Sequence, residues 1–216
     1  MGDIKLDVFA RHLKRSKEIA EEPGMNASVV RVYNEILKPY SDTYLPLDTA
    51  VAKAESAWAK ENGEALEGVL LLDEPFRTAR STALAFDPTL VLPETLKVQT
   101  TDTDRVTAIE SLIDVVDDHV GAPWADEILT GELGTKGPTV VREINEAIAA
   151  NKGVSAARQA RAEAFGPTYD RFLRFKRVVR DALGPSSKQY RRIHGRAAEK
   201  PEPNEGGGGG GGGGTT

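Results

Sequence analysis

Apolar and small residues recur at steps of three and four along most of this 216-residue chain. Near the start, one such stripe consists of Leu6, Phe9, Leu13, Ser16 and Ala20. This spacing gathers side chains on one side of an α-helix, where they can be buried together. Aromatic residues make up only 6% of the chain, which favours closely packed helices over a thick sandwich of sheets. The sequence therefore predicts an all-α fold.

Glycine, proline and short polar stretches interrupt this pattern and set the expected helix ends. The expected interruptions are residues 21–26, Pro39, and residues 73–75, 131–138, 151–153, 166–167 and 184–185. Asn26 and Thr168 are expected to cap the helices that follow them, because their side-chain oxygens can accept a hydrogen bond from a free backbone N–H. With these breaks, the pattern predicts a multi-helix bundle of about nine helices.

Residues 87–104 differ from the rest, since they have no helical period and contain two prolines among clustered Thr and Asp residues. Such a stretch is typical of an irregular connection. It separates an N-terminal helical half at residues 1–86 from a C-terminal helical half at 105–198, so the helices are expected to form one bundle or two. The glycine-rich residues 199–216 are expected to be a disordered tail.

Charge is distributed unevenly along the chain. Residues 1–151 hold 15 Lys and Arg against 27 Asp and Glu, whereas residues 152–200 hold 13 against 4. A helix expected between Thr168 and Leu183 buries its apolar half and leaves basic side chains at its back and edges. A last short helix continues the positive surface. The candidate partner-binding residues are Arg171, Arg174, Arg177, Arg180, Lys188, Arg191 and Arg192.

The positive charge of these seven residues has three interpretations. The positive surface docks on the acidic helices of residues 1–151 or on another copy of the chain, or it is a solvated face, or it grips the phosphates of nucleic acid or acidic lipid. The pI of 5.4 favours the first, because nucleic-acid-binding domains usually have a pI above about 9. The favoured partner is therefore the chain itself or another protein.

Two short segments have the composition of ligand sites but the wrong spacing. In GELGTKGPT, residues 131–139, Lys136 stands between Thr135 and Gly137, whereas a phosphate-binding loop needs adjacent Gly and Lys followed by a hydroxyl. This segment is interpreted as a flexible connection between helices. In DVVDDH, residues 114–119, Asp114 and Asp118 share a solvent face with Glu110 and Asp117 lies nearby. His119 turns to the other flank, so the aspartates and the histidine do not converge on a metal.

Several classes of protein are disfavoured by what the sequence lacks. The chain contains no cysteine, which excludes disulfide bonds and thiolate metal sites. Its three histidines stand in no known catalytic motif, so we predict no catalytic residue, no metal and no cofactor. No run approaches the roughly 20 apolar residues that a membrane helix needs, and membrane insertion is not expected. The N-terminus lacks the apolar region of a secretory signal, so the expected location is cytoplasmic.

These features together indicate a non-catalytic helical interaction or scaffolding protein, which associates with itself or docks a partner. One alternative is an accessory nucleic-acid-binding protein that uses the basic helices at residues 168–196. Another is an enzyme of unassigned class that works through the face of Asp114 and Asp118. The three alternatives differ in what they bind, and the sequence alone identifies no partner.

Overall fold

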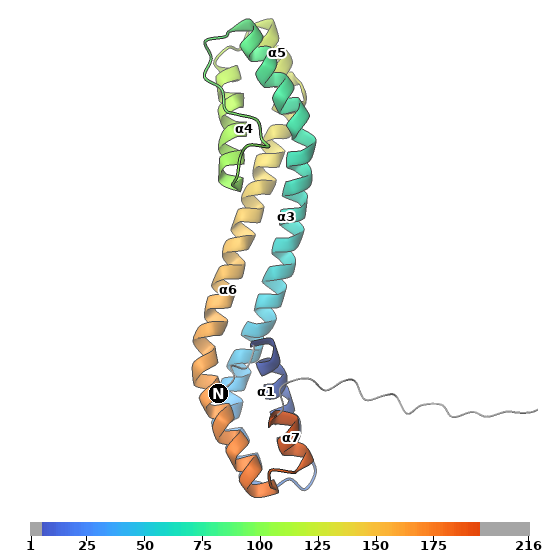
Figure 1. Ribbon diagram of the computed structural model, residues 1–216, viewed down its shortest axis with the longest axis vertical. Helices are drawn as coiled ribbons and strands as arrows, with labels where there is room; N and C mark the ends of the chain where they lie inside the picture. Colours follow the sequence, from blue (N-terminus) through green and yellow to red (C-terminus); the bar gives the residue numbers. More distant parts are fainter. Residues whose placement is uncertain (1–5, 195–216) are drawn as a thin grey trace, which may run out of the picture. The chain divides into compact units, whose positions relative to one another are not determined.

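The computed structural model describes residues 6–194, and every regular element in that range is helical (Figure 1). The elements are α1 (Leu6–Ala20), α2 (Ala27–Val32), the π-helical turn η1 (Tyr33–Leu37), α3 (Lys38–Phe86), α4 (Asp102–Asp117), α5 (Pro123–Thr130), α6 (Glu132–Leu183) and α7 (Lys188–His194). The prediction of an all-α fold is confirmed. The tail expected at residues 199–216 lies outside the described residues.

The prediction of about nine helices is wrong. Because α2, η1 and α3 follow one another without a break, residues 6–194 form six continuous helices. Several expected interruptions lie inside the two longest, since α3 contains Pro75 and α6 contains Pro138, residues 151–153 and Pro167. Thr168 is therefore an interior residue of α6 and caps no helix. An interior proline costs a helix about 3 kcal/mol. Helices of 49 and 52 residues offset this cost with apolar packing on both sides of each proline.

Other helix ends lie where local sequence signals place them. Asn26 caps α2, since its Oδ1 accepts a hydrogen bond from the Ser28 amide at 2.9 Å. Helix α5 begins at Pro123, where the missing N–H costs nothing. Helix α6 ends just before Gly184, whose φ of 87° lies in the left-handed region that favours glycine. Short-range capping chemistry therefore predicts these ends correctly.

The chain divides into two compact units. Unit 1 consists of residues 1–41 and 168–216, of which the structure describes 6–41 and 168–194. Unit 2 consists of residues 42–167. The irregular residues 87–101 lie inside unit 2. The division into helical halves at residues 87–104 stays a prediction, which limited proteolysis can test.

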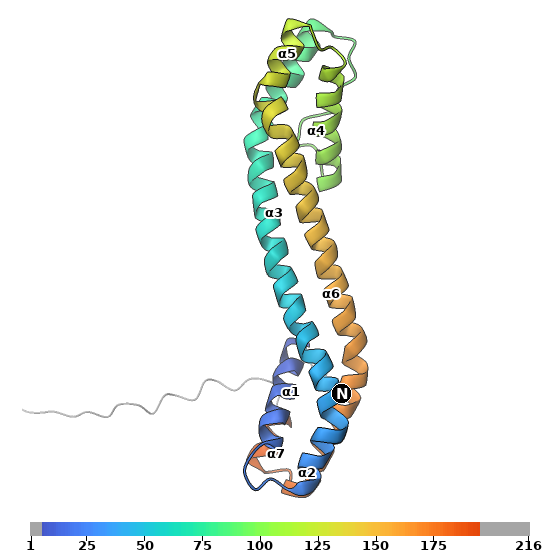
Figure 2. The ribbon, with the colours of Figure 1, turned by 180° about the vertical axis from the view of Figure 1, so that it is seen from behind.

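Unit 1 is held together by aromatic side chains from both of its chain segments. Seen from both sides, α1 lies beside α7 in this unit (Figures 1 and 2). The ring of Phe9 meets that of Phe172 edge to face at 5.6 Å between centroids, and Tyr33 meets Phe175 in the same way at 5.9 Å. Phe9, Phe172 and Phe175 are fully buried. Phe172 and Phe175 therefore belong to the buried apolar half expected for the helix between Thr168 and Leu183.

Unit 2 has its own core, to which α3, α4, α5 and α6 all contribute. Its fully buried members include Leu72, Phe76, Ile109 and Ile144. The irregular segment takes part through Leu96, which is 1% exposed within the same cluster. The segment is thus anchored at Leu96, and Leu90 and Leu92 before it are partly buried against the same core, whereas Val91 between them is exposed.

Limited proteolysis is expected to cut the body of the protein first between residues 87 and 95. This stretch forms no helix, and Val91 is 92% exposed, so it opens at a lower free energy than the helices around it. Thermolysin, which cuts before bulky apolar residues, followed by mass spectrometry of the fragments would locate the cut. Initial cuts within α3 or α6, with residues 87–95 resistant, would contradict this prediction.

Candidate functional site

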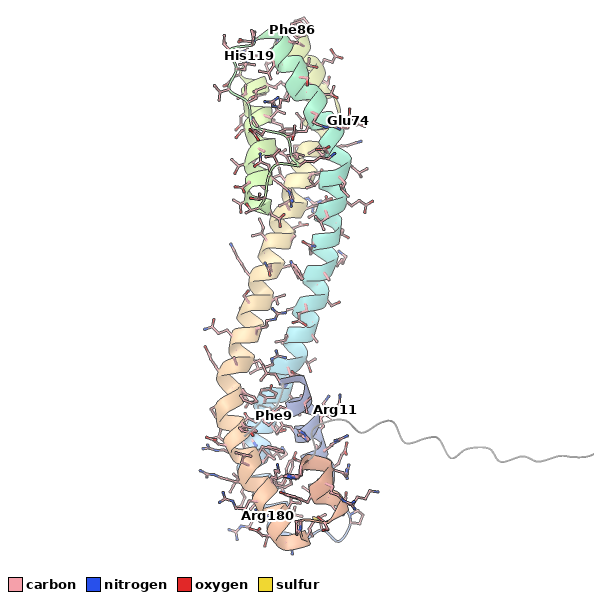
Figure 3. The ribbon with its side chains drawn as sticks, viewed as in Figure 1. Phe9, Arg11, Glu74, Phe86, His119 and Arg180 are labelled. Atoms are coloured by element: carbon pink, nitrogen blue, oxygen red, sulfur yellow. The ribbon has the colours of Figure 1, made fainter. Side chains whose placement is uncertain are left out.

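The two units carry opposite net charge. The described part of unit 1 holds 14 Lys and Arg against 7 Asp and Glu, whereas unit 2 holds 11 against 22. The positive charge of unit 1 comes from α1 as well as from α6 and α7, since Arg11 and Lys14 are exposed on α1. Figure 3 shows Arg11 and Arg180 on different helices of this unit, at its outside. Arg11 and Lys14 were not predicted from the sequence, because no local signal connects them with residues 171–192.

The predicted partner-binding residues all lie in unit 1, on α6 or α7, and differ in exposure. The exposed ones are Arg174, Arg177, Arg180, Lys188 and Arg191, and the half-buried ones are Arg171 and Arg192. The structure therefore brings the seven residues to one unit, although it gives them different surroundings. The seven residues also differ in whether they contact other side chains of unit 1.

Three of the seven residues make contacts within unit 1. The Arg171 guanidinium lies 4.7 Å from the centre of the Tyr40 ring, which is a cation–π contact. Arg180 pairs with the neighbouring Asp181 at 2.8 Å. Arg192 donates hydrogen bonds to Glu22, at 2.8 Å, and to Glu18 of α1. Of the three, Arg192 joins distant segments by charge, because it ties α7 to α1.

The other four residues make no such contact in the described part of the chain. Within residues 6–194, no ion pair involves Arg174, Arg177, Lys188 or Arg191. All four are exposed. Holding several cations on one small unit without acidic partners raises its self-repulsion, and an acidic surface from outside would relieve that repulsion. These four residues therefore form the candidate site, which we call the basic surface.

His12 is the one histidine in the described chain that is buried. Its side chain is only 3% exposed, and its ring stacks on Phe172 with 5.7 Å between centroids. The Nδ1 atom is buried without a hydrogen-bond partner. Burial lowers the pKa of His12, and the positive charges of Arg15 and Lys176 lower it further, while a hydrogen bond with the Arg192 backbone opposes the shift. Burial and the neighbouring cations therefore favour the neutral imidazole over the charged form.

Acidification is expected to destabilise unit 1 through His12. In the unfolded chain the imidazole titrates near 6.5, and in the folded unit its pKa is lower. Below pH 6.5 the unfolded state therefore binds the proton first, so the free energy of unfolding decreases as the pH falls. Urea unfolding followed by circular dichroism at several pH values would measure this slope.

The variant His12→Gln should flatten that slope, since glutamine does not titrate. The control His194→Gln should flatten it less, because His194 is exposed, although slight desolvation and the charge of Lys176 lower the pKa of His194 as well. Equal slopes in His12→Gln and the parent protein would show that other groups cause the acid sensitivity.

The acidic face of α4 offers no converging site. Asp114 and Asp118 are exposed, as is Glu110. The Nδ1 atom of His119 instead lies 2.8 Å from the carbonyl oxygen of Val115, and its ring packs on Trp124. Among the residues that the structure describes, no three His, Asp or Glu side chains gather in a way that could hold a metal ion. The enzyme alternative at Asp114 and Asp118 stays a prediction.

The interpretation of residues 131–139 as a flexible connection is wrong. Helix α5 ends at Thr130 and α6 begins at Glu132, so only Gly131 separates the two helices. The glycines here allow close packing instead. A Cβ atom at Gly137 would lie 2.9 Å from the Cδ1 atom of Ile113, and one at Gly134 would overlap the Leu129 carbonyl. Sequence spacing does not distinguish glycines used for packing from glycines used for flexibility.

Comparison of the chain with protein-family models, curated proteins and solved structures gives no match. Within residues 6–194, no helix combines the length and the apolar character that crossing a bilayer requires. What the basic surface binds is therefore inferred from its charge and its contacts.

Proposed function

We propose that this chain is a non-catalytic interaction protein whose basic surface binds an acidic protein, the first candidate being unit 2 of a second copy. One observation carries the proposal: four exposed cations without acidic partners in the described chain lie in a basic unit, and the same chain carries a unit with 22 acidic residues. Complementary charges steer two surfaces together and select their orientation. Two copies joined in this way present complementary surfaces to each other.

The expected association is salt-dependent and of modest affinity. Exposed ion pairs contribute only about 0–1 kcal/mol each, so four of them support a reversible contact and not a permanent dimer. Their attraction extends over a Debye length of about 8–10 Å at moderate salt and weakens as the salt concentration rises. Salt is therefore the variable that separates this proposal from association through apolar surfaces.

Mass in solution tests the proposal. At an ionic strength of about 0.1 M, where the Debye length is about 10 Å, light scattering should give a mass above that of one chain. At about 1 M the mass should return to the 23.3 kDa of the monomer. A chain that is monomeric in both conditions at high protein concentration would exclude self-association.

Charge reversal locates the contact. The double variant Arg174→Glu and Arg177→Glu should abolish the association at low salt. The matched control is Lys53→Glu with Lys152→Glu, which changes the net charge equally at two exposed lysines of unit 2 that make no ion pair in the described chain. Equal loss in both double variants would show that only the overall charge matters, and would contradict a specific basic surface.

Nucleic acid is the second candidate partner, because unit 1 taken by itself is basic although the whole chain is acidic. The buried rings of Phe172 and Phe175 are not free to stack on bases, so binding would rest on phosphate contacts. Fluorescence anisotropy with labelled single-stranded and duplex oligonucleotides is expected to show no binding at physiological salt. Tight binding with a steep salt dependence, lost in the Arg174 and Arg177 double variant, would favour nucleic acid instead.

A further inference from the structure

Unit 2 contains a groove of about 410 Å³ between α3 and the junction of α5 with α6. Its floor is apolar, with buried side chains from Ala79 of α3, Ile128 of α5 and Leu133 of α6. Leu71 stands at its edge and is 66% exposed. The groove is therefore formed by three helices of one unit, with a nearly buried apolar base and with Leu71 as an exposed apolar residue at its edge.

Helix α3 carries two further exposed leucines that do not line the groove. Leu66 and Leu70 are 46% and 73% exposed, and Leu71 also lines a second, smaller hollow of about 220 Å³ against α6. Three leucines exposed within two helical turns are unusual, since single exposed apolar residues are common but gathered ones mark docking surfaces. Of the three, only Leu71 lines the groove.

The rim of the groove is acidic. Glu74, Glu127 and Glu132 all line it, and Glu74 projects from the outside of α3 (Figure 3). Glu74 forms an ion pair with Arg77, and Glu132 forms one with Lys136 at 2.6 Å. No ion pair in the described chain involves Glu127. An occupant that fills the floor with apolar side chains therefore meets carboxylates on its flanks.

A second copy of this chain does not suit the groove. The same face of another copy would bring its own glutamates against this acidic rim. Unit 1 of another copy has the right charge, but within residues 6–41 and 168–194 it exposes no large apolar side chain to fill the floor. In the described parts of the chain, neither unit combines apolar and basic groups at its surface in the way the groove requires.

We infer that this groove binds a basic amphipathic helix of another protein. Apolar side chains spaced at three and four residues on that helix would fill the floor beside Leu71, and its lysines or arginines would reach the glutamates of the rim. The site is separate from the basic surface of unit 1, so it gives the chain a second, opposite docking specificity. Selectivity for a basic helix comes from charge, and most of the affinity comes from burying Leu71 and the apolar side chains of the bound helix.

A designed peptide tests this inference. The probe is a fluorescein-labelled helical peptide of leucine and lysine, with leucines at steps of three and four residues. The control peptide has the same pattern with glutamate in place of lysine. Fluorescence anisotropy with the full chain should show binding of the Leu/Lys peptide alone. Equal binding of both peptides, or of neither, would overturn the inference.

Variants of the groove decide where the peptide binds. Leu71→Asp should weaken the affinity for the Leu/Lys peptide by about tenfold or more, which corresponds to about 1.4 kcal/mol. The control Val91→Asp adds the same charge at a residue that is 92% exposed and away from the groove, and it should leave the affinity unchanged. Glu127→Lys should weaken binding more than Glu110→Lys on α4 does. Equal effects within each pair would place the peptide elsewhere.

The same variants distinguish this inference from self-association. If Leu71→Asp lowers the mass of the free protein in solution, the groove is an interface between copies and the inference is wrong. Circular dichroism should show an unchanged helix content in Leu71→Asp, and Leu71→Met should retain binding, which separates a lost contact from a lost fold. Because Arg174 and Arg177 are untouched, a negative result here leaves the proposed function of unit 1 standing.

Discussion

Replacing Phe172 by alanine should destabilise unit 1 by about 3–5 kcal/mol, the range typical of a buried phenylalanine. Its side chain is fully buried and contacts the rings of Phe9, His12 and Tyr169, so the change removes the centre of the aromatic cluster. A unit of modest size can lose its fold altogether at that cost. We expect no other single substitution proposed for this chain to have a larger effect on stability.

The two tryptophans allow the loss to be located. Trp58 and Trp124 both lie in unit 2, so tryptophan fluorescence reports on unit 2 while circular dichroism reports on all helices. In Phe172→Ala, helix signal should be lost at lower urea while the fluorescence transition stays in place. The control Phe86→Ala removes a ring that is 65% exposed in unit 2 and should cost much less. An unchanged transition in Phe172→Ala would show that Phe172 is not a core residue.

Gly134→Ala should destabilise unit 2 by about 1–3 kcal/mol, because the added methyl group overlaps the Leu129 carbonyl and forces α5 and α6 apart. Trp124 lies in α5, so its fluorescence would report the change directly. The matched control is Gly153→Ala in the same helix, where an added Cβ meets nothing within 4 Å. That control should be neutral or stabilising by up to about 1 kcal/mol. Equal effects at both glycines would contradict a packing role for Gly134.

The sequence predicted individual helices well and their assembly poorly. Periodicity and caps are local signals, and they placed the start of α2 after Asn26 and the end of α6 before Gly184. The same local signals failed at Pro75 and Pro167, because long-range packing on both sides of each proline keeps the helix continuous. A breaker residue has a known cost, but the sequence alone does not show what offsets it.

The candidate sites were predictable only in part. The cations of α6 and α7 are dense in sequence and could be found by counting, whereas Arg11 and Lys14 join them only because α1 packs in the same unit. The groove was not predicted at all. Leu70 and Leu71 stand in the apolar run at residues 68–72, and the three- and four-residue steps that put Leu72 on the buried stripe of α3 leave them off it, but those steps do not show a groove beside Leu71. The exposure of a side chain on α3 depends on which other helices pack against it.

The discontinuity of unit 1 has a consequence for synthesis on the ribosome. Residues 42–167 of unit 2 form one uninterrupted stretch, so that unit can fold as soon as it has emerged. Phe9 and Tyr33, by contrast, are translated first but must wait for Phe172 and Phe175. At about 5–20 residues per second, that wait lasts roughly 10–30 s. During this interval the nascent α1 exposes its apolar stripe, so we expect chaperones to bind the newly made chain. Premature termination before residue 168 would prevent the folding of unit 1 and leave unit 2 complete.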